Sequence, residues 1–296
     1  MITTAQAPAG WYPDPGDASG PMRYWDGERW TTWQARGGVA NEVPLSLEGA
    51  AAAWEALRDH RAPWPGTAAL VALVTGVASA GLAVASVHLG DALGLDTLAE
   101  ELVLSSLGLY AGLILACWGI QRRWGTPGGF LTDFGLEYRT GDWWRGLVGS
   151  LAARGMATVL AVILVLLVNG LHQSSYELSG TDAGITWATV GAFAVIALVF
   201  APVVEELFFR GLLLRSLETV LPGWLAIGVQ GAVFGLAHGT VDRGVANLYV
   251  IIPIGVAGMA LGWMARRYQR LSIGISAHAF FNLLPVLLLA GVYAVR

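Results

Sequence analysis

Long apolar stretches recur from residue 67 to the end of the chain, with short polar loops between them. A helix that crosses the hydrocarbon core of a bilayer needs about 20 apolar residues at 1.5 Å each. The fifth stretch is short and glycine-rich, and the last forms either one long helix or two helices broken near Pro285. We therefore predict an all-α fold, a polytopic transmembrane helical bundle of seven or eight spans, over Thr67–Leu89, Leu98–Ile120, Leu147–Val168, Ile185–Val204, Trp224–His238, Ala246–Ala265 and Ser272–Val295.

The polar N-terminal part of the chain has no apolar run long enough to span a membrane or to form the core of a signal peptide. Short aromatic runs alternate there with turn formers such as Asp26-Gly27, which is typical of a β-hairpin. We predict four parts. They are a small Trp-rich hairpin-like module over 1–36, a linker over 37–66, additional spans with a loop over 67–145, and a second transmembrane domain over 146–296.

Composition supports a membrane protein, because 55% of the residues are hydrophobic, only 13% are charged, and the mean hydropathy is +0.58. A soluble domain carries about 25% charged residues, so this chain has too few to cover a globule in water. The net charge of −4 argues against a nucleic-acid partner. The lipid bilayer is the first expected partner. The single cysteine, Cys117, allows no intrachain disulfide.

The placement of arginine predicts how the spans are oriented. If the N-terminus is cytoplasmic and every predicted span crosses, nine arginines lie in inside loops and one, Arg243, lies outside. Cytoplasmic loops carry an excess of basic residues. We therefore expect a multi-pass protein of the cell membrane with a cytosolic N-terminal module. The nine are Arg122, Arg123, Arg139, Arg145, Arg210, Arg215, Arg266, Arg267 and Arg270.

Two adjacent acids at the end of the fourth predicted span are candidates for chemistry. An ionisable side chain costs at least about 2.5–3.5 kcal/mol at the centre of a membrane helix, so it is a functional candidate by default. Glu206 and Arg210 are four residues apart, share a helix face and can form an ion pair, either supporting or purely structural. Glu205 projects about 100° away and stays available as a base or ligand.

Two histidines and an amide on other predicted helices complete the candidate set. His238 follows Phe234 by four residues, and Asn282 follows His278 by four residues, so each pair shares a helix face. If these helices converge, a carboxylate could take a proton from water, imidazoles could move that proton or hold a metal, and an amide could stabilise an oxyanion. Each residue alone could equally be a hydrogen-bond partner between helices.

The depth of these residues in the membrane constrains the fourth span. If that helix ended near Glu206, its carboxylate would lie at the interface, whereas His238 lies about 22 Å into its own helix from Gly223. The two could not meet. We therefore expect a long helix that continues past Pro202, with a kink there, to about Leu217.

The order and spacing of these residues resemble the motifs of CPBP intramembrane proteases, the family of CAAX prenyl endopeptidases and bacteriocin-processing proteins. The matching patterns are Glu-Glu-x-x-x-Arg-Gly from Glu205, Phe-x-x-x-His ending at His238, and His-x-x-x-Asn from His278. The resemblance covers roughly Gly146 to the C-terminus. It implies an intramembrane endopeptidase, open toward the cytosol, whose substrate is a membrane-associated peptide that is prenylated or bacteriocin-like. The N-terminal module resembles a short Trp-rich actinobacterial domain of unknown function.

Roles for the candidate residues follow from the same resemblance. It implies that Glu205 activates the hydrolytic water and that Glu206 and Arg210 support it. His238 and His278 are then the other essential groups, and Asn282 stabilises the oxyanion.

The resemblance favours a glutamate-dependent reaction without an obligatory cofactor. The sequence has no His-Glu-x-x-His zinc motif. If a divalent metal such as zinc is bound, Glu205, His238 and His278 are its expected ligands. Two alternatives to an enzyme remain open. One is a scaffold or immunity protein that keeps the site for binding. The other is a proton-coupled transporter, which is disfavoured because transporters are often built from inverted repeats and the acidic motif has no counterpart before Gly146.

Overall fold

The structure is a computed structural model, and it describes residues 9–14, 20–26, 29–43, 64–127, 129–169, 185–240, 244 and 246–295. The chain divides into two compact units, Met1–Arg61 and Ala62–Arg296, and each is described by itself. Three features predicted above lie wholly or mostly outside the described residues: the turn position Gly27, the loop residue Arg243 and the linker.

The first unit contains an antiparallel sheet with strand order β1-β2-β3-β4. Trp25 and Trp30 face each other across β2 and β3 and are buried edge to face, with ring centroids 5.4 Å apart. Asp14 and Arg23 form a buried ion pair at 2.6 Å, so the small core also holds one compensated charge. The hairpin-like prediction is confirmed, and the sheet continues beyond residue 36 into β4. The strands are β1 Gly10–Pro13, β2 Met22–Trp25, β3 Trp30–Arg36 and β4 Val39–Glu42.

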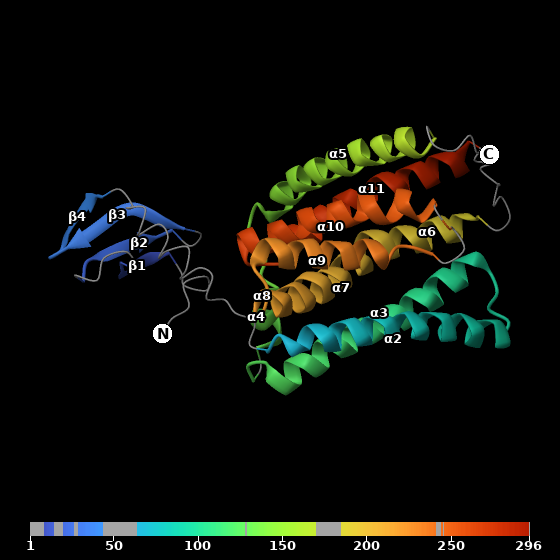
Figure 1. Cartoon of the computed structure of the whole chain (residues 1–296), viewed down its shortest axis with the longest axis horizontal. Coiled ribbons are helices and arrows are strands. Elements are labelled where there is room, and N and C mark those ends of the chain that lie inside the picture. The colour runs from blue at the N-terminus through green and yellow to red at the C-terminus, as the bar shows by residue number, and fades with distance from the viewer. Residues whose placement is uncertain are drawn as a thin grey trace. The chain divides into compact units, whose positions relative to one another are not determined.

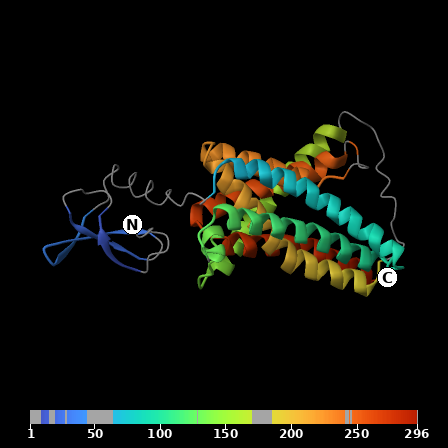
Figure 2. The ribbon, with the colours of Figure 1, turned by 90° about the horizontal axis from the view of Figure 1, so that it is seen from below.

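The second unit is a bundle of helices that lie side by side, with α2 and α3 packed together as a hairpin (Figures 1 and 2). Within the described residues, six helices are long and apolar enough to cross a membrane, and α9 is apolar but shorter. The predicted all-α membrane bundle is confirmed. The helices, with η for π-helical turns, are α2 Thr67–Ala92, α3 Leu98–Trp124, α4 Phe130–Phe134, α5 Asp142–Asn169, α6 Trp187–Val195, η1 Ile196–Phe200, α7 Ala201–Glu205, η2 Glu206–Leu214, α8 Arg215–Glu218, α9 Gly223–Leu236, α10 Leu248–Tyr268 and α11 Ser272–Ala294.

Elements α6 to α8 form one continuous helix over Trp187–Glu218, as the depth of the candidate residues predicted. The helix passes through Pro202 because the turn before it widens into η1, where the Ala201 N–H donates to the Ile196 carbonyl five residues back. Arg210 and Arg215, counted above among the loop arginines, both lie inside this helix, and Arg210 is fully buried. Neither arginine lies in a loop, so that part of the prediction is wrong.

The last predicted stretch forms the single helix α11, which continues through Pro285, so the alternative with eight spans is wrong. Proline lacks an N–H and leaves the carbonyl four residues earlier, at Phe281, without its helical donor. The Arg154 guanidinium of α5 donates to that carbonyl and lies over the Phe281 ring at 3.8 Å. In a membrane a proline is tolerated inside a helix where a neighbouring helix satisfies the freed group.

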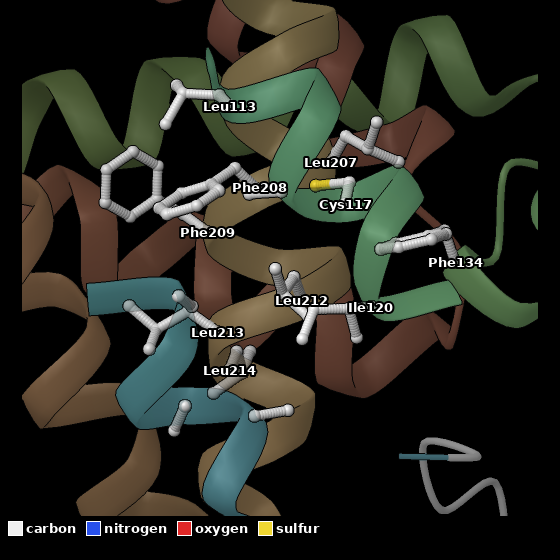
Figure 3. Packing of buried hydrophobic residues seen from close by; sticks show 14 of the residues in the cluster. Leu113, Cys117, Ile120, Phe134, Leu207, Phe208, Phe209, Leu212, Leu213 and Leu214 are labelled. Carbon is white, nitrogen blue, oxygen red and sulfur yellow. The ribbon is translucent and has the colours of Figure 1, made fainter. Parts of the chain in front are cut away.

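The main hydrophobic core surrounds η2, all of whose residues are buried. Figure 3 shows Leu113 and Cys117 of α3 in the same cluster as Phe208 and Leu212 of η2. Because all residues of η2 are buried and its apolar side chains belong to the core cluster, close packing holds the segment that follows Glu205 in place. The core therefore positions the acidic motif.

Candidate active site

The Glu206–Arg210 pair predicted from the spacing forms in the structure and is completely buried. The Arg210 Nη1 lies 2.8 Å from the Glu206 Oε1, and both side chains have 0% exposure. Arg210 also donates to the Gly258 carbonyl at 3.1 Å and lies over the Phe234 ring at 4.2 Å. A buried charge is tolerated when it is paired and hydrogen-bonded. These contacts compensate the charge of Arg210, while the Arg210 Nε and the Glu206 Oε2 have no hydrogen-bond partner among the described residues.

His278 joins this pair from α11. Its Nδ1 lies 3.2 Å from the Glu206 Oε1, the same oxygen that accepts from Arg210. Close approach of the two helices depends on Gly274, because a Cβ there would lie 2.7 Å from the Glu206 Oε2. A glycine one turn before the histidine therefore lets the carboxylate reach the ring.

Glu205 faces the two histidines rather than Arg210. Its Oε2 lies 4.0 Å from the His238 Nε2 and 3.9 Å from the His278 Nε2. This oxygen is buried and has no hydrogen-bond partner among the residues that the structure describes. Separations near 4 Å suit a water that is about 2.8 Å from each of two such atoms. Glu205, Glu206, Arg210, His238 and His278 are together called the polar cluster below.

The hydrogen bonds of the two histidines define which ring nitrogen faces Glu205. The His238 Nδ1 lies 2.8 Å from the Phe234 carbonyl, which can only accept, so Nδ1 carries the proton. In the neutral ring its Nε2 is then a lone pair directed at the Glu205 side. The His278 Nδ1 likewise donates to the Glu206 carboxylate, and its Nε2 faces the same oxygen of Glu205. The Glu205 carboxylate and the His238 Nε2 are thus two hydrogen-bond acceptors that face the same position. The His278 Nε2 faces it too, as an acceptor in the neutral ring or as a donor in the protonated ring.

His238 is the most exposed of the three side chains that face this point. The His238 side chain is 32% exposed, whereas those of Glu205 and His278 are 12% and 5% exposed.

Tyr110 of α3 is a residue that the sequence reasoning missed. Its hydroxyl donates to the Glu205 Oε1 over 3.5 Å, so it contacts the carboxylate oxygen that does not face the histidines. The sequence signal was weak, because a lone tyrosine in an apolar run has no partner at helical spacing. The α2–α3 hairpin, whose purpose the sequence left unassigned, therefore contributes a polar group to the cluster.

Asn282 differs from the other five predicted site residues. Its Nδ2 donates to the Ala197 carbonyl of η1 at 2.8 Å. In the described part of the chain it makes no hydrogen bond to a member of the polar cluster. The structure thus brings together five of the six predicted residues and directs the sixth to the backbone of the helix that carries Glu205.

The arrangement does not match a zinc site. Ligands around a tetrahedral zinc with bonds of about 2.0–2.1 Å are roughly 3.4 Å apart, whereas Glu205 lies 3.9 and 4.0 Å from the two imidazoles. Among the described residues, no group of three His, Cys, Asp or Glu side chains is arranged to hold a metal.

Comparison with known families identifies a match over the part of the chain that contains the candidate site. Residues 186–284 match the Rce1-like type II CAAX prenyl endopeptidases, and all six predicted site residues lie in this range. Residues 9–41, which include the sheet, match a protein family of unknown function, DUF2510. No curated protein and no solved structure matches the chain. The chain therefore contains an Rce1-like CAAX prenyl endopeptidase domain at residues 186–284, within a bundle whose helices are long and apolar enough to cross a membrane, and a DUF2510 module near its N-terminus.

Proposed function

We propose that this protein hydrolyses a peptide bond of a membrane-associated peptide with a water activated by Glu205. One observation carries the proposal, namely that the Glu205 Oε2 is buried, unpartnered among the described residues and about 4 Å from two imidazole Nε2 atoms. Buried polar atoms are nearly always hydrogen-bonded, and a catalytic group awaiting its water is one explanation for an exception.

The geometry supports a two-step hydrolysis. A water between Glu205 and His238 donates one hydrogen bond to each, because both face it with lone pairs. Glu205 takes one proton as the water oxygen bonds to the carbonyl carbon, whose π electrons move to the oxygen. When the tetrahedral intermediate collapses, the C–N bond breaks and Glu205 returns its proton to the leaving amine. No external acid is needed.

His278 supplies the positive counterpart of this reaction. The polar cluster holds two carboxylates and one guanidinium, and Arg210 is committed to Glu206. When His278 carries both ring protons, it donates to Glu206 through Nδ1 and presents the Nε2–H near the Glu205 Oε2. There it can stabilise the oxyanion that develops on the substrate. Glu206 and Arg210 therefore act by orienting His278.

The expected substrate is a membrane-associated peptide, with a prenylated or a bacteriocin-like peptide as the two candidates. The family match supports the prenylated class, because the matched family is that of CAAX prenyl endopeptidases. A farnesylated CaaX peptide with a fluorophore is therefore the first probe for the purified protein in liposomes.

His238→Ala is expected to lower kcat on that probe by about 10²–10⁴-fold, the contribution of a positioned acid–base group. The reason is that the water loses one of its two acceptors. His88→Ala is the matched control, because His88 is exposed at the end of α2, away from the polar cluster, and its Nδ1 lies 3.8 Å from the Asp91 carboxylate. Cleavage of the probe by His238→Ala at the wild-type rate would rule out this role.

The N-terminus is expected to be cytosolic, because arginines in loops and at helix ends concentrate on that side even when Arg210 and Arg215 are set aside. A cysteine at Val39, which is exposed in β4, should react with a membrane-impermeant maleimide only after cells are lysed. A cysteine at Leu95, which is exposed between α2 and α3, should react in intact cells. The native Cys117 is buried and gives little background. The opposite labelling pattern would reverse the orientation.

A further inference from the structure

Proline residues inside the membrane helices leave carbonyl groups that need a new donor. Pro285 frees the Phe281 carbonyl, and Arg154 donates to it. Pro202 raises the same requirement in the helix that carries Glu205, three residues before the acid. A carbonyl without a donor is costly in a membrane interior, so the group that satisfies it matters for the local fold.

The hydrogen-bond register of η1 identifies the carbonyl that Pro202 leaves free. Ala201 donates to Ile196, five residues back, so the next donor in that register would be residue 202 to the Ala197 carbonyl. Proline has no N–H and cannot make this bond. The Asn282 Nδ2 takes its place at 2.8 Å, from 85 positions further along the chain. An amide side chain thus completes a backbone ladder that proline interrupts.

From this substitution of donors we infer that Asn282 is a positioning residue, which holds α11 against the Glu205 helix through the Ala197 carbonyl rather than stabilising an oxyanion. The inference rests on the proposed function. His278 lies one turn before Asn282, and Glu205 lies two turns after Ala197, so this bond joins the two helices close to the reacting groups. It helps to fix the 3.9 Å separation between the Glu205 Oε2 and the His278 Nε2.

A second hydrogen bond of the same kind, between α11 and α5, supports the positioning role of Asn282. The neighbouring residue Phe281 accepts from Arg154 of α5 through its own proline-freed carbonyl. The segment from His278 to Asn282 is therefore held between α5 and η1 by two hydrogen bonds, one accepted and one donated. Each bond is accepted by a carbonyl whose backbone donor is replaced by a proline.

A proline exchange tests the inference, because Pro202→Ala supplies the missing N–H. Asn282→Ala is expected to lower kcat about 10- to 100-fold with KM little changed, since the reacting groups shift relative to each other. The double variant Pro202→Ala/Asn282→Ala is expected to recover kcat to within about threefold of Pro202→Ala alone. Pro253→Ala/Asn282→Ala is the control, because Pro253 lies in α10 and frees a different carbonyl, and it should not recover.

Thermal unfolding in detergent gives a readout that needs no substrate. Asn282→Ala should lower the midpoint by about 2–4 °C, and Pro202→Ala should restore it in the double variant. If Asn282→Ala does not accumulate as folded protein, recovery of folded protein in Pro202→Ala/Asn282→Ala supports the inference in the same way as a restored midpoint. A double variant that melts like the wild type but stays as inactive as Asn282→Ala would overturn the inference and return Asn282 to the oxyanion. If the wild type cleaves no probe, the proposed function fails while the melting result still decides the hydrogen bond.

Discussion

Glu205→Gln is expected to lower kcat by about 10²–10⁴-fold or more while the protein remains folded in the membrane. A carboxamide cannot accept the proton of the attacking water, so the first step loses its base. The change should cost little stability, because the Glu205 Oε2 has no hydrogen-bond partner to lose in the described structure. Activity on the farnesylated probe and the thermal midpoint of the purified variant measure the two effects separately.

The same variant separates an enzyme from a scaffold. Mass spectrometry of membrane peptides from cells with the wild type and with Glu205→Gln should reveal fragments that only the wild type makes. A Gln variant as active as the wild type would refute Glu205 as the base. Full biological activity in a variant that cleaves nothing would instead favour a scaffold or immunity protein.

Glu206→Gln, one residue further on, is expected to give the opposite phenotype, a large loss of stability. It removes the counter-charge of Arg210, whose side chain has 0% exposure, and leaves a buried cation without compensation. Breaking one side of a buried ion pair costs about 3–5 kcal/mol. The thermal midpoint should therefore fall by roughly 6–20 °C, measured in the same detergent as the wild type.

A double variant provides the matched control for this effect. Replacing both partners, as in Glu206→Gln/Arg210→Met, removes the uncompensated charge, and apolar replacement of a buried pair is often close to neutral. Most of the lost stability should return. Activity should stay low, because the His278 Nδ1 no longer has a charged partner. A single Glu206→Gln variant that melts like the wild type would show that the pair contributes little to the fold.

The predictable parts of the structure are those that depend on residues close together in the sequence. The spans follow from apolar runs, because backbone groups in lipid must bond within their own helix. The pairing of Glu206 with Arg210 follows from a separation of four residues. The long helix through Pro202 followed from depth alone, since Glu205 and His238 had to reach the same level.

The parts that could not be predicted depend on contacts between distant residues. Tyr110 meets Glu205 across 95 positions, and Asn282 meets Ala197 across 85, and neither pair has a spacing that a single sequence reveals. The π-helical turns were equally hidden, because a shift of one residue in hydrogen-bond register leaves the apolar pattern unchanged. The oxyanion role expected for Asn282 came from the family resemblance. Its hydrogen-bond partner, the Ala197 carbonyl, depends on the π-helical register of η1, which the sequence does not reveal.

The contact from Tyr110 has a consequence for where the working unit begins. The segment that matches the peptidase family starts at residue 186, yet α3, which carries Tyr110, ends at Trp124. A fragment cut at the family boundary would lose a hydroxyl from the carboxylate and the leucines that pack on η2. A fragment that keeps the proposed activity is therefore expected to need the α2–α3 hairpin in addition to residues 186–284.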